Sequence, residues 1–214
     1  MNLKRVVVTG IGALTPIGNT AEEFWNGLAT GVSGAAPITR FDASLFKTQF
    51  ACEIKNFDVE QFMDRKEARK MDPFTQYAMI AVDEAMADSG LDLEKINKAR
   101  AGVIWGSGIG GLKTFQDEVT DFIKGDGTPR FNPFFIPKMI ADITRVLFQS
   151  NTDLEVQLCN RFSACASATN ALIDAFNYIR LGKADIFHKW WFGSSSDRSW
   201  RWWIQCHEGT FTAK

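Results

Sequence analysis

Cys165 is the side chain in this sequence whose surroundings best suit a nucleophile. It follows Ser163 and Ala164 and precedes a helix that a run of small residues predicts from about 166 to 181. The N-terminus of a helix stabilises a thiolate, and small neighbours leave room for a substrate. The alternative is a buried cysteine that packs as a small apolar side chain, and the spacing alone favours that alternative.

Two glycine-rich turns could hold a nucleotide phosphate. Gly106, Gly108 and Gly111 match the pattern G-x-G-x-x-G between a predicted strand and a predicted helix, and residues 9–12 read TGIG. In such turns the backbone approaches a pyrophosphate at a helix N-terminus. However, the acidic residue that a dinucleotide-binding domain places after its next strand is not evident here, and no Tyr-x-x-x-Lys pair is present. Tight packing of a strand on a helix is the favoured interpretation, and a Rossmann-type oxidoreductase is the alternative.

Composition argues against several other classes of function. Lysine and arginine number 24 and aspartate and glutamate 25, so the net charge of −1 predicts neither nucleic acid nor an anionic membrane as a partner. The two histidines and four cysteines show no metal-ligand spacing, and we expect no metal and no cofactor. No apolar run approaches 18 residues, and the first residues lead directly into VVV without the pattern of a secretory signal. We therefore expect a cytoplasmic protein with reduced thiols.

The expected elements alternate between strands and helices. Residues 4–11 are typical of a buried strand that ends in a glycine turn, and Pro73 begins a long helix that ends before Gly90. Further strands are expected at 101–105 and from 184 to 187, and further helices at 21–30 and 112–124. This alternation predicts an α/β protein with a mainly parallel sheet.

Five segments of the sequence are long enough to be compared with known families. They are KRVVVTGIGALTPIG (4–18), KEARKMD (66–72), GSGIGG (106–111), FNPFFIP (131–137) and SACASATNAL (163–172). Together they resemble the β-ketoacyl-acyl-carrier-protein synthase II family, the elongating condensing enzymes of bacterial fatty acid synthesis. The resemblance covers 1–143 and 163–187 almost continuously.

This resemblance implies a thiolase-like fold, a layered α/β/α/β/α arrangement of two similar halves, of which the chain holds most of the first. It also implies that Cys165 takes an acyl group from acyl carrier protein and that decarboxylation of malonyl carrier protein supplies the carbanion that attacks it. The family draws two histidines, a lysine and part of the oxyanion hole from its second half. Neither His188 nor His207 lies in a family histidine motif.

The resemblance further implies which residues contact the substrate and the partners. Ile109 matches the position that gates the acyl tunnel, and Phe134 or Phe135 matches the wall of the acyl pocket. The enzyme is expected to form a homodimer.

A basic patch is expected to bind the acidic carrier protein. Three residues match it: Lys66, Arg69 and Lys70. Composition alone favours the alternative, a solvated helix face.

Two segments depart from the family, 144–162 and 188–214, so that the expected domain 1–187 contains one aberrant stretch and is followed by an aberrant tail. Five of the seven tryptophans lie in the last 25 residues. Because TGG is the only tryptophan codon, glycine codons read out of frame explain this cluster. Suitable codons for 190–197, shifted by one base, read GGSEAAA, and suitable codons for 150–157, shifted by two, read KYGLRGP, both of which are family patterns.

We therefore interpret both segments as frameshift products and expect an incomplete, inactive chain. The alternatives are a genuine aromatic tail that binds a partner or a membrane surface, and a non-catalytic half-domain that binds an acyl chain or the carrier protein. In place of a core strand, 144–162 would bring Asp153, Glu155 and Arg161 into the interior.

Overall fold

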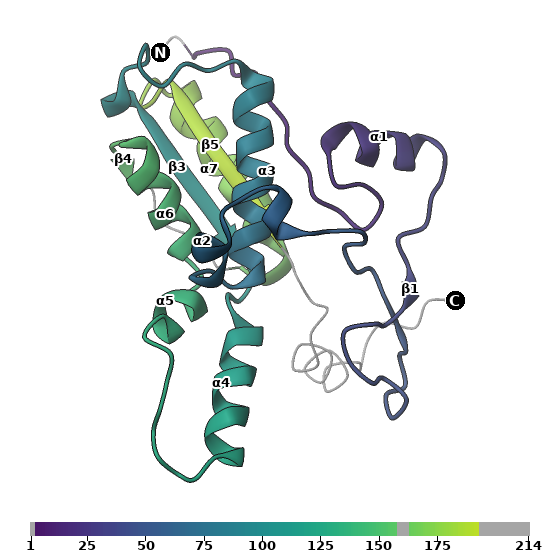
Figure 1. Ribbon diagram of the computed structural model, residues 1–214. Helices are drawn as coiled ribbons and strands as arrows, with labels where there is room; N and C mark the ends of the chain where they lie inside the picture. Colours follow the sequence, from purple (N-terminus) through teal and green to yellow (C-terminus); the bar gives the residue numbers. More distant parts are fainter. Residues whose placement is uncertain (1–2, 158–162, 193–214) are drawn as a thin grey trace.

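The computed structural model describes residues 3–157 and 163–192, and its centre is a parallel sheet covered by helices on both faces (Figure 1). The sheet has three strands in the order β4-β3-β5, which are Val156–Gln157, Ala101–Ser107 and Ile186–Phe192. All seven residues of β3 are buried. A central parallel strand is buried on both faces, which explains its continuous apolar run rather than an alternating one.

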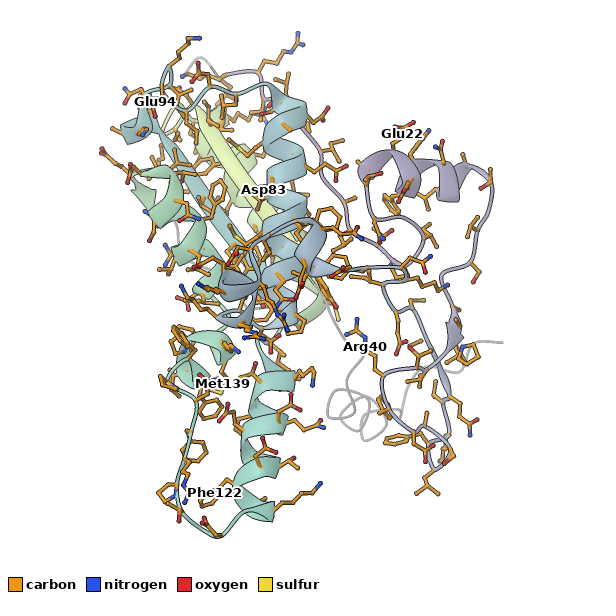
Figure 2. All side chains as sticks on the ribbon, in the orientation of Figure 1. Glu22, Arg40, Asp83, Glu94, Phe122 and Met139 are labelled. Carbon is orange, nitrogen blue, oxygen red and sulfur yellow. The ribbon has the colours of Figure 1, made fainter. Side chains whose placement is uncertain are left out.

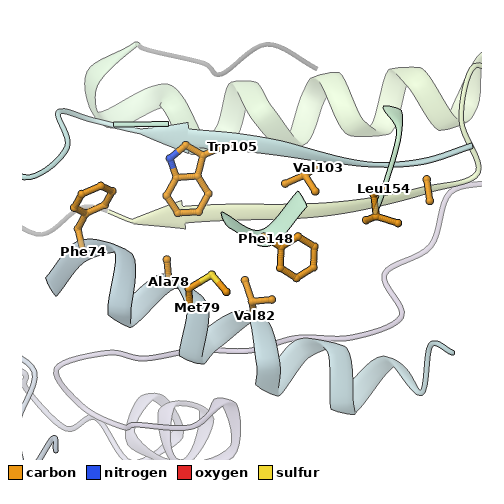
Figure 3. Packing of buried hydrophobic residues seen from close by; sticks show 9 residues of the cluster. Phe74, Ala78, Met79, Val82, Val103, Trp105, Phe148 and Leu154 are labelled. Atoms are coloured by element: carbon orange, nitrogen blue, oxygen red, sulfur yellow. The ribbon is translucent and has the colours of Figure 1, made fainter. Parts of the chain in front are cut away.

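One face of the sheet packs against two helices, α3 (Pro73–Ser89) and α6 (Ile143–Thr152). Figure 3 shows α3 below the strands, with Val82 and Phe148 pointing into the space between them. Each large apolar side chain that is fully buried there stabilises the fold by about 1.5–3 kcal/mol. The cluster consists of Phe74, Ala78, Met79, Val82, Ala101, Val103, Trp105, Phe148 and Leu154.

Helix α7 (Ser167–Arg180) covers the other face of the sheet. Its small residues Ala171 and Ala175 pack against Ile104 of β3, with Phe187 of β5 beside them. Small side chains at this spacing allow the helix axis to lie close to the strands. The predicted helix and its position after Cys165 are therefore confirmed.

The remaining elements are short or lie at the periphery. Helix α1 (Ala21–Ala29) and the antiparallel pair β1 (Ala36–Pro37) and β2 (Phe50–Ala51) lie to one side of the sheet (Figure 1). Three short helical segments are η1 (Val59–Gln61), α2 (Arg65–Arg69) and η2 (Lys98–Arg100), and a one-turn η3 (Ala164–Ala166) precedes α7.

An arm made of α4 (Leu112–Lys124), a loop and α5 (Phe135–Met139) extends away from the sheet. In Figure 2, Phe122 lies toward the far end of this arm and Met139 lies near the sheet. Aromatic rings line its inner side: the centroids of Phe122 and Phe131 are 5.5 Å apart, and those of Phe131 and Phe135 are 5.6 Å apart.

The prediction of a buried strand at 4–11 is wrong. This segment is extended but joins no strand in the described part of the chain, and the exposed fractions of Val7 and Val8 are 57% and 78%. Isolated hydrogen bonds hold this segment instead. The backbone N–H of Lys4 donates to the Arg180 carbonyl, and that of Ile11 donates to the Asp88 carboxylate. Without a neighbouring strand there is no ladder of hydrogen bonds to define a strand.

A cluster of ion pairs lies where β3 and β5 begin and also includes the N-terminal segment. Asp185, just before β5, accepts hydrogen bonds from Arg100 and from Lys4, the latter at 2.7 Å. The hydrogen bond from Arg100, and then that from Lys4, hold the pKa of the Asp185 carboxyl well below its usual range. The cluster therefore fastens the N-terminal segment and β5 to the start of β3.

The expected burial of charge in 144–162 is also wrong for the residues that the structure describes. Asp153 ends α6 in the left-handed conformation (φ 54°) and is exposed, as is Glu155. Between them Leu154 is buried in the core cluster. The residues alternate between core and solvent here, so the charges reach water. Arg161 lies outside the described residues.

Candidate active site

Cys165 lies in the η3 turn directly before α7, and its side chain is exposed. This position confirms the prediction that it lies at the start of a helix. It also excludes the alternative of a buried, structural cysteine, because a thiol that packs in a core is not accessible to solvent. An exposed thiol at this place can be reached by a reactant.

A small hydrogen-bond network fixes the conformation of the Cys165 turn. The Oγ of Ser167 accepts from the backbone N–H of Ser163 at 2.9 Å and donates to the carbonyl of Ala164 at 2.8 Å. The amide Nδ2 of Asn170 donates to the Oγ of Ser163 at 2.6 Å. Ser167 is fully buried, so its two bonds are partly shielded from water, whereas the bond between Asn170 and Ser163 is exposed.

The network coincides with backbone strain immediately before the thiol. Ala164 has a φ of 48°, in the left-handed region that a residue with a Cβ rarely adopts. The two bonds of Ser167 reach across this residue and hold it there. Sequence reasoning did not select Ser167 as a functional residue, because a serine in SACASATNAL looks like any other small neighbour.

The glycine turn at 106–111 lies beside the Cys165 turn. A Cβ on Gly106 would be 2.6 Å from the carbonyl oxygen of Ser167, and one on Gly108 would be 3.9 Å from that of Ala164. The last residues of β3 therefore approach the start of α7 as closely as backbones can.

The same packing argues against a phosphate site. The space beside Gly106 is filled by the backbone of Ser167, and the space beside Gly111 by the carbonyl of Lys138. At the N-terminal turn, Gly10 and Gly12 lie against the backbone of α3. The glycines serve close packing, which is the interpretation that the sequence favoured, and the oxidoreductase alternative has no support in the structure.

The candidate acyl-pocket residues lie on two adjoining segments. Ile109 is 46% exposed in the glycine turn, Phe134 is 42% exposed at the start of α5, and Phe135 is partly buried. The segments meet through the backbone, because the N–H of Gly111 donates to the carbonyl of Met139 at 3.0 Å. The structure thus brings the turn that carries Ile109 next to both α5 and Cys165.

The basic residues Lys66, Arg69 and Lys70 are all exposed, on or directly after α2. Lys70 pairs with Glu67 at 2.6 Å, whereas Lys66 and Arg69 form no ion pair within the described ranges. Gln76 of α3 donates to the carbonyl of Ala68 at 2.8 Å and so fastens α2 to the core helix. No hydrogen bond or ion pair joins the three basic side chains to the described Cys165 turn.

Asp72 connects the first turns of α3 and α4, and its role in joining the two helices was not predicted from the sequence. Asp72 is 4% exposed. One oxygen accepts from the N–H of Phe74 in the first turn of α3, and the other accepts from the N–H and the Oγ1 of Thr114 in the first turn of α4. An aspartate before a proline predicts the cap of one helix. Nothing local in the sequence indicates a partner 42 residues away.

The described residues contain no group of three or more histidine, cysteine, aspartate or glutamate side chains that could hold a metal ion. No helix in the described ranges has the length and the apolar content to cross a membrane.

Comparison with known proteins assigns this geometry to a family. The family model for the β-ketoacyl synthase N-terminal domain matches residues 3–187. A 3-oxoacyl-[acyl-carrier-protein] synthase 2 of Synechocystis sp. is 45% identical over 181 residues, which are 85% of this chain and 43% of that protein. The enzyme of the same name from Staphylococcus aureus is 42% identical over 184 residues, 85% of this chain and 44% of that protein. The chain thus spans less than half the length of these relatives.

Solved structures agree with the sequence relatives. The ishigamide ketosynthase/chain length factor superposes with a TM-score of 0.84 at 26% identity, covering 99% of this chain and 52% of that one. A β-ketoacyl synthase from Burkholderia phymatum superposes with a TM-score of 0.70 at 28% identity, covering 85% of this chain and 45% of that one.

A third neighbour, at 22% identity, is a ketosynthase in complex with its type II polyketide acyl-carrier protein, with a TM-score of 0.79 over 94% of this chain and 54% of that one. These neighbours confirm the predicted thiolase-like α/β fold. With the family match over residues 3–187 and relatives above 40% identity, the chain belongs to the β-ketoacyl synthase family.

Proposed function

We propose that this chain is the N-terminal half of a β-ketoacyl-acyl-carrier-protein synthase in which Cys165 is the acyl-accepting nucleophile. The observation that carries the proposal is the exposed thiol of Cys165 in a turn held by buried Ser167, at the N-terminus of α7. The relatives named 3-oxoacyl-[acyl-carrier-protein] synthase 2 support the reaction class.

The proposed reaction has two stages. The Cys165 thiol gives its proton to solvent, and the thiolate attacks the carbonyl carbon of an acyl thioester. A carbon–sulfur bond to Cys165 forms, the carbon–sulfur bond to the carrier breaks, and the carrier leaves as a thiolate that takes a proton from solvent. Malonyl carrier protein then loses CO₂, and the resulting carbanion attacks the acyl-cysteine carbonyl and releases the Cys165 thiolate. The carbanion needs stabilisation of its developing negative charge. We assign that task to the second half of the full-length enzyme.

We further propose where the partners bind. Lys66, Arg69 and Lys70 form the docking patch for the acidic carrier protein, and their exposure on α2 supports this. Ile109 and either Phe134 or Phe135 line the acyl pocket, and the contact between the glycine turn and α5 supports that.

The full-length enzyme is proposed to be a homodimer. The exposed aromatic side chains of the arm support a protein interface there, because apolar patches of this kind are covered in an assembly. They are Phe115, Phe122 and Phe131. We place the reaction in the cytoplasm, where a thiol nucleophile stays reduced.

We also propose that 144–162 and 188–214 are read in shifted frames in this sequence. The family match supports the second boundary, since it ends at residue 187. The tryptophan-rich composition of the tail supports it independently. Reading the nucleotides that encode both segments tests the proposal: compensating insertions or deletions would support it, and an uninterrupted frame confirmed by mass spectrometry of the tail would contradict it.

Labelling of the thiols tests the nucleophile. Cys52 is the matched control, because it is also a free and exposed cysteine. In the full-length, frame-corrected enzyme, a long-chain acyl carrier protein should acylate Cys165 and leave Cys52 unmodified in peptide mass spectra. Cys165→Ala should abolish the acyl adduct and Cys52→Ala should leave it unchanged. An adduct on Cys52 in preference to Cys165 would overturn the assignment.

A further inference from the structure

We propose that Asp72 and Thr114 form a positioning pair that sets the acyl-chain pocket of this enzyme, an inference that rests on the proposed function. The side-chain hydrogen bond between them, from Thr114 Oγ1 to the Asp72 carboxylate, is 2.6 Å long. Neither residue contacts Cys165 through a described hydrogen bond. The pair acts through the glycine turn that carries Ile109.

The pair is stable because one buried carboxylate satisfies two helix N-termini. The backbone N–H groups of Phe74 and Thr114 donate to its two oxygens at 3.2 Å and 3.1 Å. Helix N-termini carry a partial positive charge and unpaired N–H donors, so a carboxylate between two of them is favoured on both counts. Burial strengthens these bonds and makes the loss of any one of them costly.

The hydrogen bonds of Asp72 also restrain the glycine turn, because Thr114 lies close to the end of that turn. Thr114 lies three residues after Gly111, the N-cap residue directly before α4, and a Cβ on Gly111 would be 3.1 Å from the Asp72 carboxylate. The Asp72–Thr114 bonds therefore hold the end of the turn against the N-terminus of α3. Ile109 lies two residues before Gly111 in the same turn.

The glycine turn also holds α5 in place. The N–H of Gly111 donates to the carbonyl of Met139 at 3.0 Å, and the carbonyl of Lys138 lies against the Cα of Gly111. Ile109, Phe134 directly before α5 and Phe135 in its first turn are thus positioned by a common anchor. Loosening Asp72–Thr114 should widen or shift the pocket for the acyl chain and leave the Cys165 turn, which Ser167 holds, in place.

This difference predicts a change in substrate preference rather than a uniform loss. A short acyl group does not extend along the pocket, whereas a long one depends on the pocket walls for its binding energy. Removing the pair should therefore slow acylation by long-chain thioesters more than acylation by short-chain ones.

The test measures acylation of Cys165 in the full-length, frame-corrected enzyme by acetyl and by long-chain carrier protein. Thr114→Val removes only the hydroxyl donor and keeps the side-chain shape, and Thr114→Ser restores the donor. Thr20→Val is the matched control, because Thr20 caps α1 through its side chain at a place remote from the glycine turn. Asp72→Asn provides a second variant at the acceptor.

Thr114→Val should lower the long-chain rate constant about tenfold relative to the acetyl rate constant, as expected for a lost bond to a buried charge. Thr114→Ser should restore the ratio, and Thr20→Val should leave it unchanged. Equal losses for both substrates, or an unchanged ratio in Thr114→Val, would overturn the inference. If the unsubstituted enzyme forms no acyl-Cys165 with either substrate, the proposed function itself is wrong.

Discussion

The reactivity expected of Cys165 depends on side chains that do not themselves react. The hydroxyl of Ser167 makes both of its hydrogen bonds within the turn. It accepts from the N–H of Ser163 and donates to the carbonyl of Ala164. The turn keeps Ala164 in a left-handed conformation that its Cβ disfavours. The thiol is therefore presented by a conformation that the buried serine stabilises.

The exposed basic side chains on and after α2 are proposed to bind the carrier protein, and Arg69 is one of them. Arg69→Glu should weaken binding of acyl carrier protein to the full-length enzyme by about tenfold at low salt and by much less at high salt, because exposed charges are screened and act mainly on the association rate. Binding measured at two ionic strengths checks this.

Arg130→Glu is the matched control, since Arg130 is also exposed but pairs with Asp126 on the distant arm. If Arg69→Glu and the unsubstituted enzyme bind the carrier protein with equal affinity at low salt, the patch is a solvated helix face and not a docking site.

At the scale of elements, the site depends on how closely β3 and α7 approach each other. Gly106 is buried at the end of β3, directly against the carbonyl of Ser167. The small side chains of α7 permit the same approach farther along the helix. The strand thus supplies the glycine turn and the helix supplies the Cys165 turn.

Gly106→Ala should lower the free energy of unfolding by about 1–3 kcal/mol, because the added methyl group would overlap backbone that cannot move without shifting α7. It should also reduce the rate of Cys165 alkylation by displacing the start of α7. Denaturant unfolding and thiol alkylation of the full-length enzyme measure both effects.

Gly108→Ala is the control, since its Cβ would lie 3.9 Å from the nearest atom, an ordinary van der Waals distance. A Gly108→Ala variant as unstable as Gly106→Ala would show that close approach at Gly106 is not the cause.

Local signals were sufficient to predict some of these elements. Asp72, Pro73 and Gly90 mark both ends of α3, and the small residues after Cys165 predict α7. Residues 4–11 show the limit of such signals, because β-branched residues favour a strand but cannot supply its neighbour. The hydrogen bond between Asp72 and Thr114 could not be predicted from local signals either, because it depends on how the chain folds between the two residues.

At the scale of the whole molecule, the chain contains a sheet with both faces covered, an exposed thiol, and an arm with exposed aromatic side chains. It covers 43% of the Synechocystis relative. The motifs that the family shares were enough to predict the family and the fold, because they are long and occur in the family order. The exposure of Asp153 and Glu155 was not predictable from those motifs, since this segment departs from them.

The polypeptide of these 214 residues alone is expected to form no ketoacyl product. Its described part contains Cys165, the proposed nucleophile, but the proposal assigns stabilisation of the carbanion to the second half of the full-length enzyme. Electrostatic stabilisation of this kind contributes a factor of about 10²–10³ for each donor removed, so its loss should bring turnover below detection.

The most direct test of the roles assigned to Cys165 and to the second half is ketoacyl formation from acyl and malonyl carrier protein, measured side by side for three proteins. These are the full-length, frame-corrected enzyme, its Cys165→Ala variant, and the 214-residue chain. We predict turnover by the first alone. Turnover by the Cys165→Ala variant would contradict the role of Cys165, and turnover by the 214-residue chain would contradict the assignment of carbanion stabilisation to the second half.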